Sequence, residues 1–324
     1  MSDFSVLDDP LGQALHDLYM TGALHTRCDF SAPWGLELPH LPSMLMFHVV
    51  LSGTCWIEVD GQLPRLLKPG DLALVPHGDG HRLVSSPGEG ARSLWDFTDP
   101  DASHRYEVIR QDGGGDATVL VCSTVAYEGE VARSLVGSLP TLICVDATRA
   151  SRSDWVFSTL RLLSTEARHP QPGGAAVVAR LSDVLLILTI RLWLEEEPSH
   201  SPGWLMALRD RKIGRAMRMI HDSPAAPWTV AMLADAVAMS RSAFAARFTD
   251  LAGEPPMQYV TRWRMQLAAS LLRNSSATIG DIALQLGYQS EAAFSRSFKR
   301  WSGVAPGSER KRPPSPVGPS RVPV

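Results

Sequence analysis

The stretch that decides the fold runs from Thr278 to Trp301 and reads TIGDIALQLGYQSEAAFSRSFKRW. Its pattern predicts two helices separated by a tight turn. Thr278 caps the first helix, with Asp281 at the reciprocal capping position. Gly287 stands where the chain turns sharply and needs a left-handed residue. Ser290 caps the second helix, so the stretch predicts a helix-turn-helix unit.

The second of these helices has one apolar face and one small, basic face. Phe294 and Phe298 are four residues apart and point to the same side, which we expect to be the core. The opposite side holds Glu291, Ala292, Ser295, Arg296 and Lys299. A short capped helix with such an outer face suits the major groove of DNA.

The same pattern occurs about fifty residues upstream, between positions 230 and 248. Ser240 caps a helix in which Phe244 and Phe248 are again four residues apart. A longer helix is expected to join the two units, and Pro255 and Pro256 fit only at its start. Two such units on one rigid helix can enter successive major grooves on one face of DNA.

The charge is divided unevenly along the 324 residues. Overall the chain has a net charge of −3, with 44% hydrophobic and 20% charged residues, which is ordinary for a globular protein of two domains. Residues 206–307 hold 13 Lys and Arg against 7 Asp and Glu, whereas residues 1–205 hold 14 against 26. We therefore expect only the carboxyl-terminal third to bind a polyanion.

We expect no membrane partner and a cytoplasmic location. The first 20 residues lack the basic and apolar segments of a secretory signal peptide. The longest apolar run, 184–190, is too short to cross a bilayer. The four cysteines show no CxxC spacing, so free thiols in a reducing compartment are expected.

Preceding the helix-turn-helix units, the chain changes character twice. Residues 1–20 predict an amphipathic helix, and residues 24–147 predict short strands of a barrel or sandwich. Among these, 93–97 is one predicted strand. Residues 153–197 predict a helical hairpin with more apolar surface than it can bury alone, so it packs either on the barrel or on a second copy. The predicted class is a multidomain α+β fold.

Residues 206–308 resemble the AraC/XylS-type DNA-binding domain, through LADAVAMSRSAFAARF, GEPPMQYVTRWRMQLAASLLR and IALQLGYQSEAAFSRSFKRWSGVAP. The resemblance implies a sequence-specific transcription regulator that binds promoter or operator DNA and acts on RNA polymerase. It implies two recognition helices, at 240–248 and 290–300. The side chains it places toward DNA are Arg241, Ser242, Ala245, Ala246, Arg247, Ala292, Ser295, Arg296, Lys299 and Arg300.

The first unit departs from the family pattern at its turn. Ala238 stands where glycine is usual, so we expect a strained or different turn there. Ala245 and Ala246 leave the first recognition helix with little hydrogen-bonding capacity, so its discrimination would rest on Arg241, thymine methyl contacts and DNA shape. Arg247 and Arg300 have an alternative interpretation as solvated charges.

Residues 24–147 resemble a cupin-type sensor domain. The segment GDLALVPHGDGH over 70–81 is similar to the second cupin motif, and 47–53 with 58–61 to a degraded first motif. The candidate metal or effector ligands are His48, Glu58, His77 and His81. Their alternative roles are to cap turns or to line an effector pocket without metal. The rival function is a metal-dependent cupin enzyme with a DNA-binding appendage, and we expect no enzyme and no cofactor.

Two kinds of signal could control such a regulator: a small molecule or an oxidant. Cys28 is the candidate redox residue because it precedes the segment 33–35 and is expected to be exposed, while Cys55, Cys122 and Cys144 are expected to be buried in strands. The predicted domains are a sensor over 1–150, a hairpin and linker over 151–205 that supports a homodimer, a DNA-binding domain over 206–308 and a disordered tail over 309–324.

Overall fold

The computed structural model describes residues 21–98, 106–127, 130–146, 154–168, 171–196 and 203–311. The chain divides into two compact units. The sheet unit holds Tyr19–Glu128 and Leu139–Pro198, and the helical unit holds Gly129–Ser138 and Ser199–Ser315. The predicted helix over 1–20 and the predicted tail beyond 311 lie outside the described residues.

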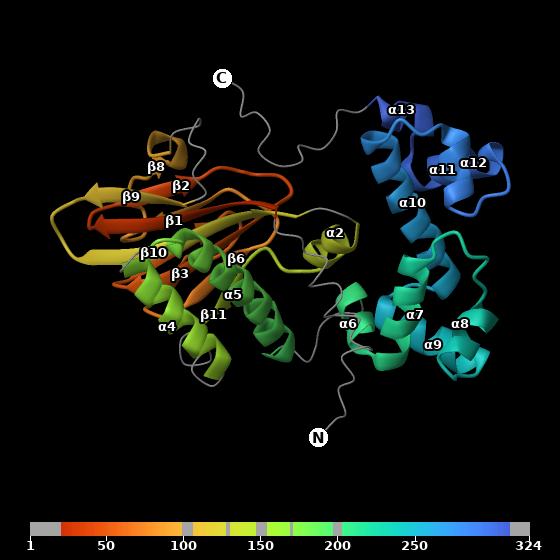
Figure 1. Ribbon diagram of the computed structural model, residues 1–324, viewed down its shortest axis with the longest axis horizontal. Coiled ribbons are helices and arrows are strands. Elements are labelled where there is room, and N and C mark those ends of the chain that lie inside the picture. The colour runs from red at the N-terminus through yellow and green to blue at the C-terminus, as the bar shows by residue number, and fades with distance from the viewer. Residues whose placement is uncertain are drawn as a thin grey trace. The chain divides into compact units, whose positions relative to one another are not determined.

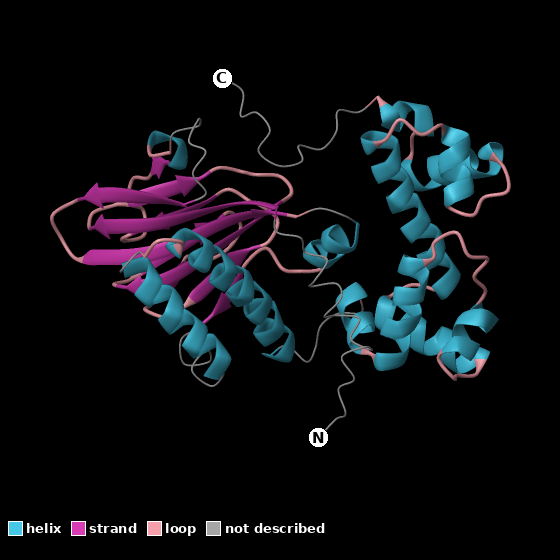
Figure 2. Cartoon of the chain, in the orientation of Figure 1, coloured by secondary structure: helices cyan, strands magenta, loops and turns pink. Residues whose placement is uncertain are grey.

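The sheet unit is a sandwich of two sheets, drawn as arrows in Figure 1 and magenta in Figure 2. The six-stranded sheet has the order β11 (Ile143–Val145), β6 (Leu72–Val75), β3 (Met44–Ser52), β10 (Ala117–Ala126), β1 (Thr21–Ser31) and β9 (Tyr106–Asp112). The five-stranded sheet has the order β5 (Arg65–Leu67), β4 (Cys55–Val59), β7 (His81–Val84), β2 (Gly35–Leu38) and β8 (Arg92–Ser93). Neighbouring strands are antiparallel except for the parallel pairs β1–β9 and β2–β8.

The main core of this unit lies between the two sheets. On β3 alternate side chains, Met46 and Val50, belong to that core, as the two-residue period of a strand requires. Phe47 and Val49 between them are buried as well. Their burial is explained by a second layer on the outer face, where α5 (Gly174–Glu196) contacts β1, β6 and β11.

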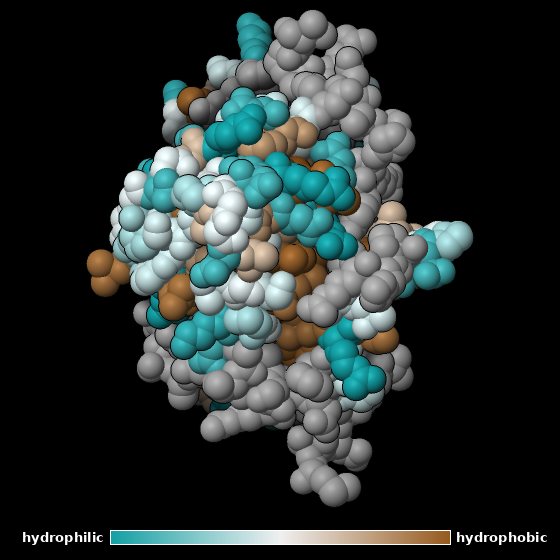
Figure 3. Space-filling view, turned by 90° about the vertical axis from the view of Figure 1, so that its left-hand side faces the viewer, coloured by the Kyte–Doolittle hydropathy of each residue, from teal (hydrophilic) through white to brown (hydrophobic). Residues whose placement is uncertain are grey.

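The predicted hairpin consists of α5 and α4 (Asp154–Arg168), which pack against each other across the six-stranded sheet (Figure 1). The hairpin therefore takes the first of its two predicted positions, on the sheet. Large apolar side chains nevertheless remain exposed on it, among them Trp155 at 78% and Leu162 at 60%. Figure 3 shows that apolar side chains also gather at the centre of one face of the sheet unit, with polar ones around them.

The helical unit is built around one long helix, α10 (Pro256–Asn274) (Figure 1). The other helices are α2 (Glu130–Gly137), α6 (Trp204–Arg209), α7 (Arg211–Asp222), α8 (Val230–Ala236), α9 (Arg241–Ala252), α11 (Ile279–Gln285), α12 (Glu291–Ser302) and α13 (Pro306–Arg310). No helix among the described residues is long and apolar enough to cross a membrane.

Each end of α10 belongs to a different core. Near its start, Tyr259 packs edge-on against Phe248 and Trp263 stacks on His221, with ring centroids 5.5 and 3.9 Å apart. Its second half, from Met265 to Leu272, shares a core with α11 and α12. The two helix-turn-helix units are thus attached to one continuous helix, as the sequence predicts.

Three details differ from the sequence predictions. The predicted strand over 93–97 is wrong after its first residue, because Ser93 caps the short 3-10 helix η2 (Leu94–Asp96). Helix α2 lies within the predicted sensor segment 1–150 yet packs in the helical unit against α6 and α10. Glu309, placed in the predicted tail, is 3% exposed and bonds Arg273 at 2.5 Å.

Candidate nucleic-acid interface and sensor core

The two helix-turn-helix units are capped in the same way. Ser240 and Ser290 each accept a backbone N–H from the third residue of the recognition helices α9 and α12, at 3.3 and 3.2 Å. Thr278 and Asp281 form the full reciprocal capping box at the start of α11. Hydrogen bonds from Thr278 hold the pKa of the Asp281 carboxyl below its ordinary value, so the cap is present at neutral pH.

Both turns also follow one backbone path. In the first unit the N–H of Met239 donates to the carbonyl of Ala234 at 2.9 Å, and in the second Tyr288 donates to Ala283 at 2.9 Å. The residue before each donor takes a positive φ, which is 51° at Ala238. The prediction of a strained turn there is confirmed, because an alanine adopts the conformation that favours glycine.

The four phenylalanines are core residues. Phe244 and Phe248 are fully buried and their ring centroids are 5.6 Å apart; for Phe294 and Phe298 the separation is 5.8 Å. Because these pairs fix which side of each helix is inside, they also fix which side faces solvent.

Every side chain that the resemblance places toward DNA lies on those outer sides. Exposed are Arg241, Ser242, Ala246, Arg247, Ala292, Arg296, Lys299 and Arg300, and half-buried are Ala245 and Ser295. None of the ten is buried, so the structure brings the set onto the accessible surfaces of α9 and α12. Their individual contacts with bases stay predictions.

The basic side chains of this set are not equivalent. Arg247 forms an ion pair with Asp210, whose Oδ2 accepts from Nε at 2.8 Å. Within the described part of the chain, Arg241, Arg296, Lys299 and Arg300 form no ion pair or side-chain hydrogen bond. These four are available to phosphates or bases, whereas Arg247 is already engaged in holding α9.

Sequence reasoning missed the residues that orient α9. Asp210 caps α7 through Oδ1, which accepts from the backbone of Lys212 and Ile213, while its Oδ2 holds Arg247. The Nζ of Lys212 donates to the carbonyl of Ala238 at 2.9 Å. Asp210 therefore ties α7 to the recognition helix and Lys212 ties α7 to the turn, and only the spacing of Asp210 from the helix signals the first contact in the sequence.

In the sheet unit, two of the four candidate ligands meet across the core. His48 of β3 and His81 of β7 are 1% and 4% exposed, and their Nε2 atoms are 2.8 Å apart. The Nδ1 of His81 donates to the carbonyl of Asp79 at 2.9 Å. Burial lowers the pKa of His81 to about 4, so at neutral pH its ring has one proton, on Nδ1, and its Nε2 accepts from His48.

The other two candidates lie elsewhere. Glu58 pairs with Arg82 at 2.5 Å, and His77 donates from Nε2 to the carbonyl of Leu139 at 3.0 Å. Among the described residues no three His, Cys, Asp or Glu side chains gather as metal ligands. The four candidates therefore do not gather into one set of metal ligands in the part of the sheet unit that the structure describes.

The prediction that Cys28 is exposed is wrong. Cys28 is 0% exposed in the core between the sheets, together with Cys55 and Cys122, and Cys144 packs against that core. A hydrogen bond with Cys28, and burial, raise the pKa of the Cys122 thiol, and burial raises that of Cys55 and Cys144. Thiols in such surroundings are poor nucleophiles.

Comparison with known proteins agrees with this division. The chain matches the cupin family over residues 9–195 and the helix-turn-helix domain family over residues 233–312. It is 34% identical to a protein of Streptomyces lividans named an AraC-like transcription regulator, over 95% of this chain and 100% of that protein.

Two further relatives are similar along most of their length. The chain is 30% identical to the HTH-type transcriptional regulator MtrA of Neisseria gonorrhoeae, over 90% of this chain and 94% of that protein. It is 26% identical to the RCS-specific HTH-type transcriptional activator RclR of Escherichia coli K12, over 90% of this chain and 93% of that protein.

Proposed function

We propose that this chain, which belongs to the family of AraC-like transcription regulators, reads operator DNA with α9 and α12 and relies on α12 for most of its polar contacts. The observation that carries the proposal is the pair of equivalently capped helices whose outer sides hold unpaired basic groups. Helix α10, with 19 residues, is about 28 Å long, close to the ~34 Å between successive major grooves on one face of DNA.

The difference between the two helices supports an unequal division of labour. Helix α12 presents the hydroxyl of Ser295 and the charged donors of Arg296 and Lys299. Helix α9 presents Ala245 and Ala246 where α12 has polar groups. Alanine contacts a thymine methyl but accepts or donates nothing, so α9 would contribute mainly through shape.

The experiment is a selection of DNA from a random library by the full-length protein, followed by gel-shift titration of the recovered sequence. We expect recovery of a bipartite site, a steep fall of affinity with salt from phosphate contacts, and weaker binding by Arg296→Ala. Arg110→Ala, which changes an exposed arginine of β9, is the matched control. A library that shows no enriched sequence over a protein-free selection contradicts the proposal.

The regulator is further proposed to act on RNA polymerase in the cytoplasm. A template with the selected site upstream of a promoter, transcribed in vitro by bacterial polymerase, tests this step. The wild-type protein should change transcript yield in either direction, while Arg296→Ala should have a weaker effect. Unchanged yield at full operator occupancy would contradict an action on polymerase.

The sheet unit is proposed to sense a small-molecule effector. An oxidant is less well supported, because the four thiols are buried or half-buried and the raised pKa of three of them suppresses the thiolate. The chain itself offers a route for the signal: α2 follows β10 and precedes β11, yet packs on α6 and α10.

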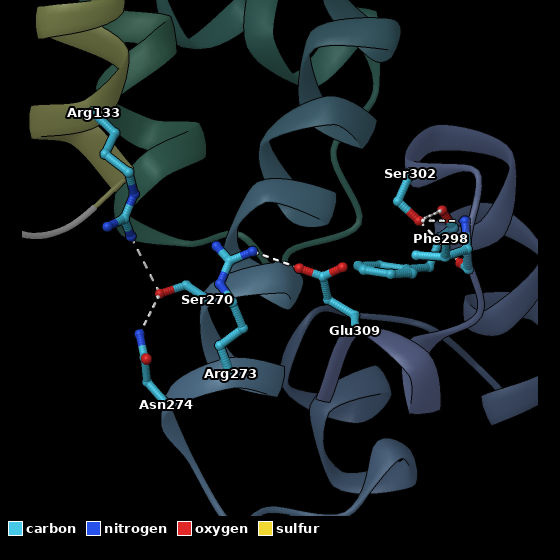
Figure 4. A network of polar contacts seen from close by, with 8 residues as sticks. Arg133, Ser270, Arg273, Asn274, Phe298, Ser302 and Glu309 are labelled. Carbon is cyan, nitrogen blue, oxygen red and sulfur yellow. Dashed lines mark hydrogen bonds and ion pairs between the residues drawn. The ribbon is translucent and has the colours of Figure 1, made fainter. Parts of the chain in front are cut away.

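The contact of α2 with α10 is specific (Figure 4). The Nη2 of Arg133 donates to Ser270 Oγ at 3.3 Å, and Asn274 donates to the same oxygen at 3.4 Å. Ala132, Leu135 and Val136 of α2 are at most 1% exposed. A shift of β10 or β11 on effector binding would therefore pull directly on the helix that carries both recognition helices.

A homodimer through α4 and α5 completes the proposal. The two helices line a groove of about 330 Å³, and Trp155 at its edge is 78% exposed. Sedimentation of the full chain tests it: Trp155→Asp should dissociate the dimer, while Arg161→Asp, on an exposed position of the same helix that faces away from Trp155, should not. An equal dimer fraction in both variants would place the contact elsewhere.

A further inference from the structure

The loop between α7 and α8, Ser223–Trp228, contacts both helix-turn-helix units. It has a fixed shape, because the carbonyl of Ser223 accepts from the backbone of Ala226 at 3.1 Å and from the Nε1 of Trp228 at 2.9 Å. This shape presents three successive carbonyls, those of residues 224, 225 and 226, to groups outside the first unit.

Arg264 of α10 binds two of these carbonyls. Its Nε donates to the carbonyl of Pro224 and its Nη2 to that of Ala226, both at 2.7 Å. The guanidinium lies 5.9 Å from the ring centroid of Tyr288, the residue after the turn of the second unit. Arg264 is half-buried between the first unit's loop and the second unit's turn, and short charge-assisted bonds of this kind are the stronger ones.

The third carbonyl lies against Gly287 in the turn of the second unit. A Cβ built on Gly287 would be 2.4 Å from the oxygen of Ala225, which is backbone and has no side-chain freedom to move away. Gly287 is therefore required twice, once for its φ of 77° and once because the first unit's loop approaches so closely.

These contacts connect the two helix-turn-helix units a second time, in addition to the connection through α10. The first unit packs on the start of α10 and the second on its last turns. A single helix joining two bodies can bend or twist. The loop adds a second connection at a distance from the helix axis, and two separate attachments remove the freedom to rotate.

We propose that Arg264, with the loop carbonyls and Gly287, locks the orientation of α9 relative to α12 and thereby sets the spacing between the two DNA boxes that the protein accepts. Arg264 is a positioning residue, since it is tied to the loop rather than to α9 or α12. The effect on the spacing between DNA boxes rests on the proposed function. The fixed orientation of α9 relative to α12 does not, and it can be tested without DNA.

A matched control lies two residues away on the same helix. The Nε of Arg262 donates to Glu254 at 2.7 Å, and its guanidinium lies 4.9 Å from the ring centroid of Tyr259. Its Nη1 also donates to Gln266, one turn further along the same helix, at 3.1 Å. None of these partners belongs to α11 or α12, so this arginine does not bridge the two units. Arg262→Gln therefore reports the cost of losing a half-buried arginine while the contacts between the loop and Arg264 remain.

The DNA arm uses the sequence selected by the full-length protein, resynthesised with one, two or three base pairs inserted or deleted between its two boxes. The wild type should prefer the parent spacing by at least about tenfold, about 1.4 kcal/mol. Arg264→Gln should reduce that preference to about twofold or less, Arg264→Lys should be intermediate, and Arg262→Gln should keep it. A preference unchanged in Arg264→Gln, or lost equally in Arg262→Gln, would overturn the lock.

The conformational arm needs no DNA. Nitroxides attached through p-acetylphenylalanine at the exposed positions of Asp250 and Arg300 report the distance between α9 and α12 in the full chain by pulsed electron resonance. The distribution should be narrow in the wild type and Arg262→Gln and at least about twice as wide in Arg264→Gln. Equal widths overturn the lock. A widened distribution with no DNA recovered would uphold the lock and contradict the proposed function instead.

Discussion

Ala238 and Gly287 occupy equivalent positions in the two helix-turn-helix turns, both in the left-handed region, with φ of 51° and 77°. Each is followed by a residue whose N–H donates back to a helix carbonyl at 2.9 Å. The two turns therefore have the same backbone conformation. Glycine adopts it without steric cost, whereas alanine is strained by it. An L-residue pays roughly 1–2 kcal/mol for this conformation.

Replacing Ala238 by glycine should therefore stabilise the helical unit. We expect a gain of about 0.5–1 kcal/mol in the free energy of unfolding, because relief of the left-handed strain exceeds the added backbone entropy of glycine. Urea unfolding followed by helical circular dichroism measures the change. Ala292→Gly, in the first turn of α12, is the control and should destabilise by about 0.5–1 kcal/mol.

The converse substitution, Gly287→Ala, should destabilise the helical unit. It places a Cβ 2.4 Å from the oxygen of Ala225, so we expect the free energy of unfolding to fall by clearly more than 1 kcal/mol in the same urea measurement. If Ala238→Gly and Ala292→Gly changed stability by the same amount and in the same direction, the turn at Ala238 would have no strain to relieve.

Arg296 and Arg241 should differ in their effect on sequence discrimination. Arg296→Ala should weaken binding to the selected site by roughly 1–3 kcal/mol and reduce the preference for that site over a scrambled one. Arg241→Ala should reduce the preference less, because its helix offers mainly alanine to the bases. Gel-shift titration of both sequences at one fixed salt concentration measures this. Comparable losses of discrimination would contradict the ranking of the two helices.

His48 and His81 should behave as one coupled pair in stability measurements. His81→Leu leaves the Nε2 donor of His48 buried without an acceptor, which should cost about 1–3 kcal/mol. His48→Leu strands the acceptor of His81 in the same way. The double variant should cost less than the sum, since neither group remains to be stranded.

The measurement is urea unfolding of the full chain, following amide exchange of β3 and β7 so that the sheet unit is observed by itself. Strictly additive losses would contradict the coupling. A rise in the unfolding temperature of the wild type with added Zn²⁺, absent from the double variant, would show instead that the pair binds metal.

The helical region could be predicted from sequence almost throughout, because each signal there is local. Caps, turn glycine and the four-residue spacing of Phe294 and Phe298 act within one or two turns of helix. The sheet unit could be predicted less completely. Strand β4 was located correctly, but β1 and β9 pair only through contacts between distant segments, and no local pattern specifies such a partner.

The surface of the recognition helices could also be predicted from local signals. Which side chains face outward followed from the positions of the phenylalanines. What the sequence could not provide is which outward arginine is already engaged: Arg247 meets Asp210 from 37 residues away. The separation of Glu58 from His48 has the same cause: Ile57 and Val59 of β4 face the core, so Glu58 between them points away from it and pairs with Arg82.

Buried histidines should make the protein less stable as the pH falls from neutrality. In the helical unit His221 stacks on Trp263 and its Nε2 is 2.7 Å from the hydroxyl of Tyr259. Burial, and then the charge of Arg262, lower the pKa of His221 to about 3. The folded ring is therefore neutral at pH 5, whereas the unfolded ring takes up a proton below its ordinary pKa of about 6.5.

The sign of the effect follows from this proton balance. Between pH 6.5 and pH 3 the unfolded chain binds more protons, so each such histidine should lower the free energy of unfolding by up to about 1.4 kcal/mol per pH unit as the pH falls. His81 and His25, both with a pKa lowered to about 4 by burial, should do the same for the sheet unit. Stability should be fully present above pH 6.5.

His221→Phe tests the assignment for the helical unit. Phenylalanine keeps the stack on Trp263 but cannot accept from Tyr259, so the variant should be less stable at pH 7.5 by about 1 kcal/mol. Its stability should then fall less steeply than that of the wild type, with the two curves converging toward pH 5. Urea unfolding of the helical unit at pH 7.5, 6.5, 5.5 and 5.0 measures both slopes. Parallel curves across that range would show that His221 does not control the acid sensitivity of this unit.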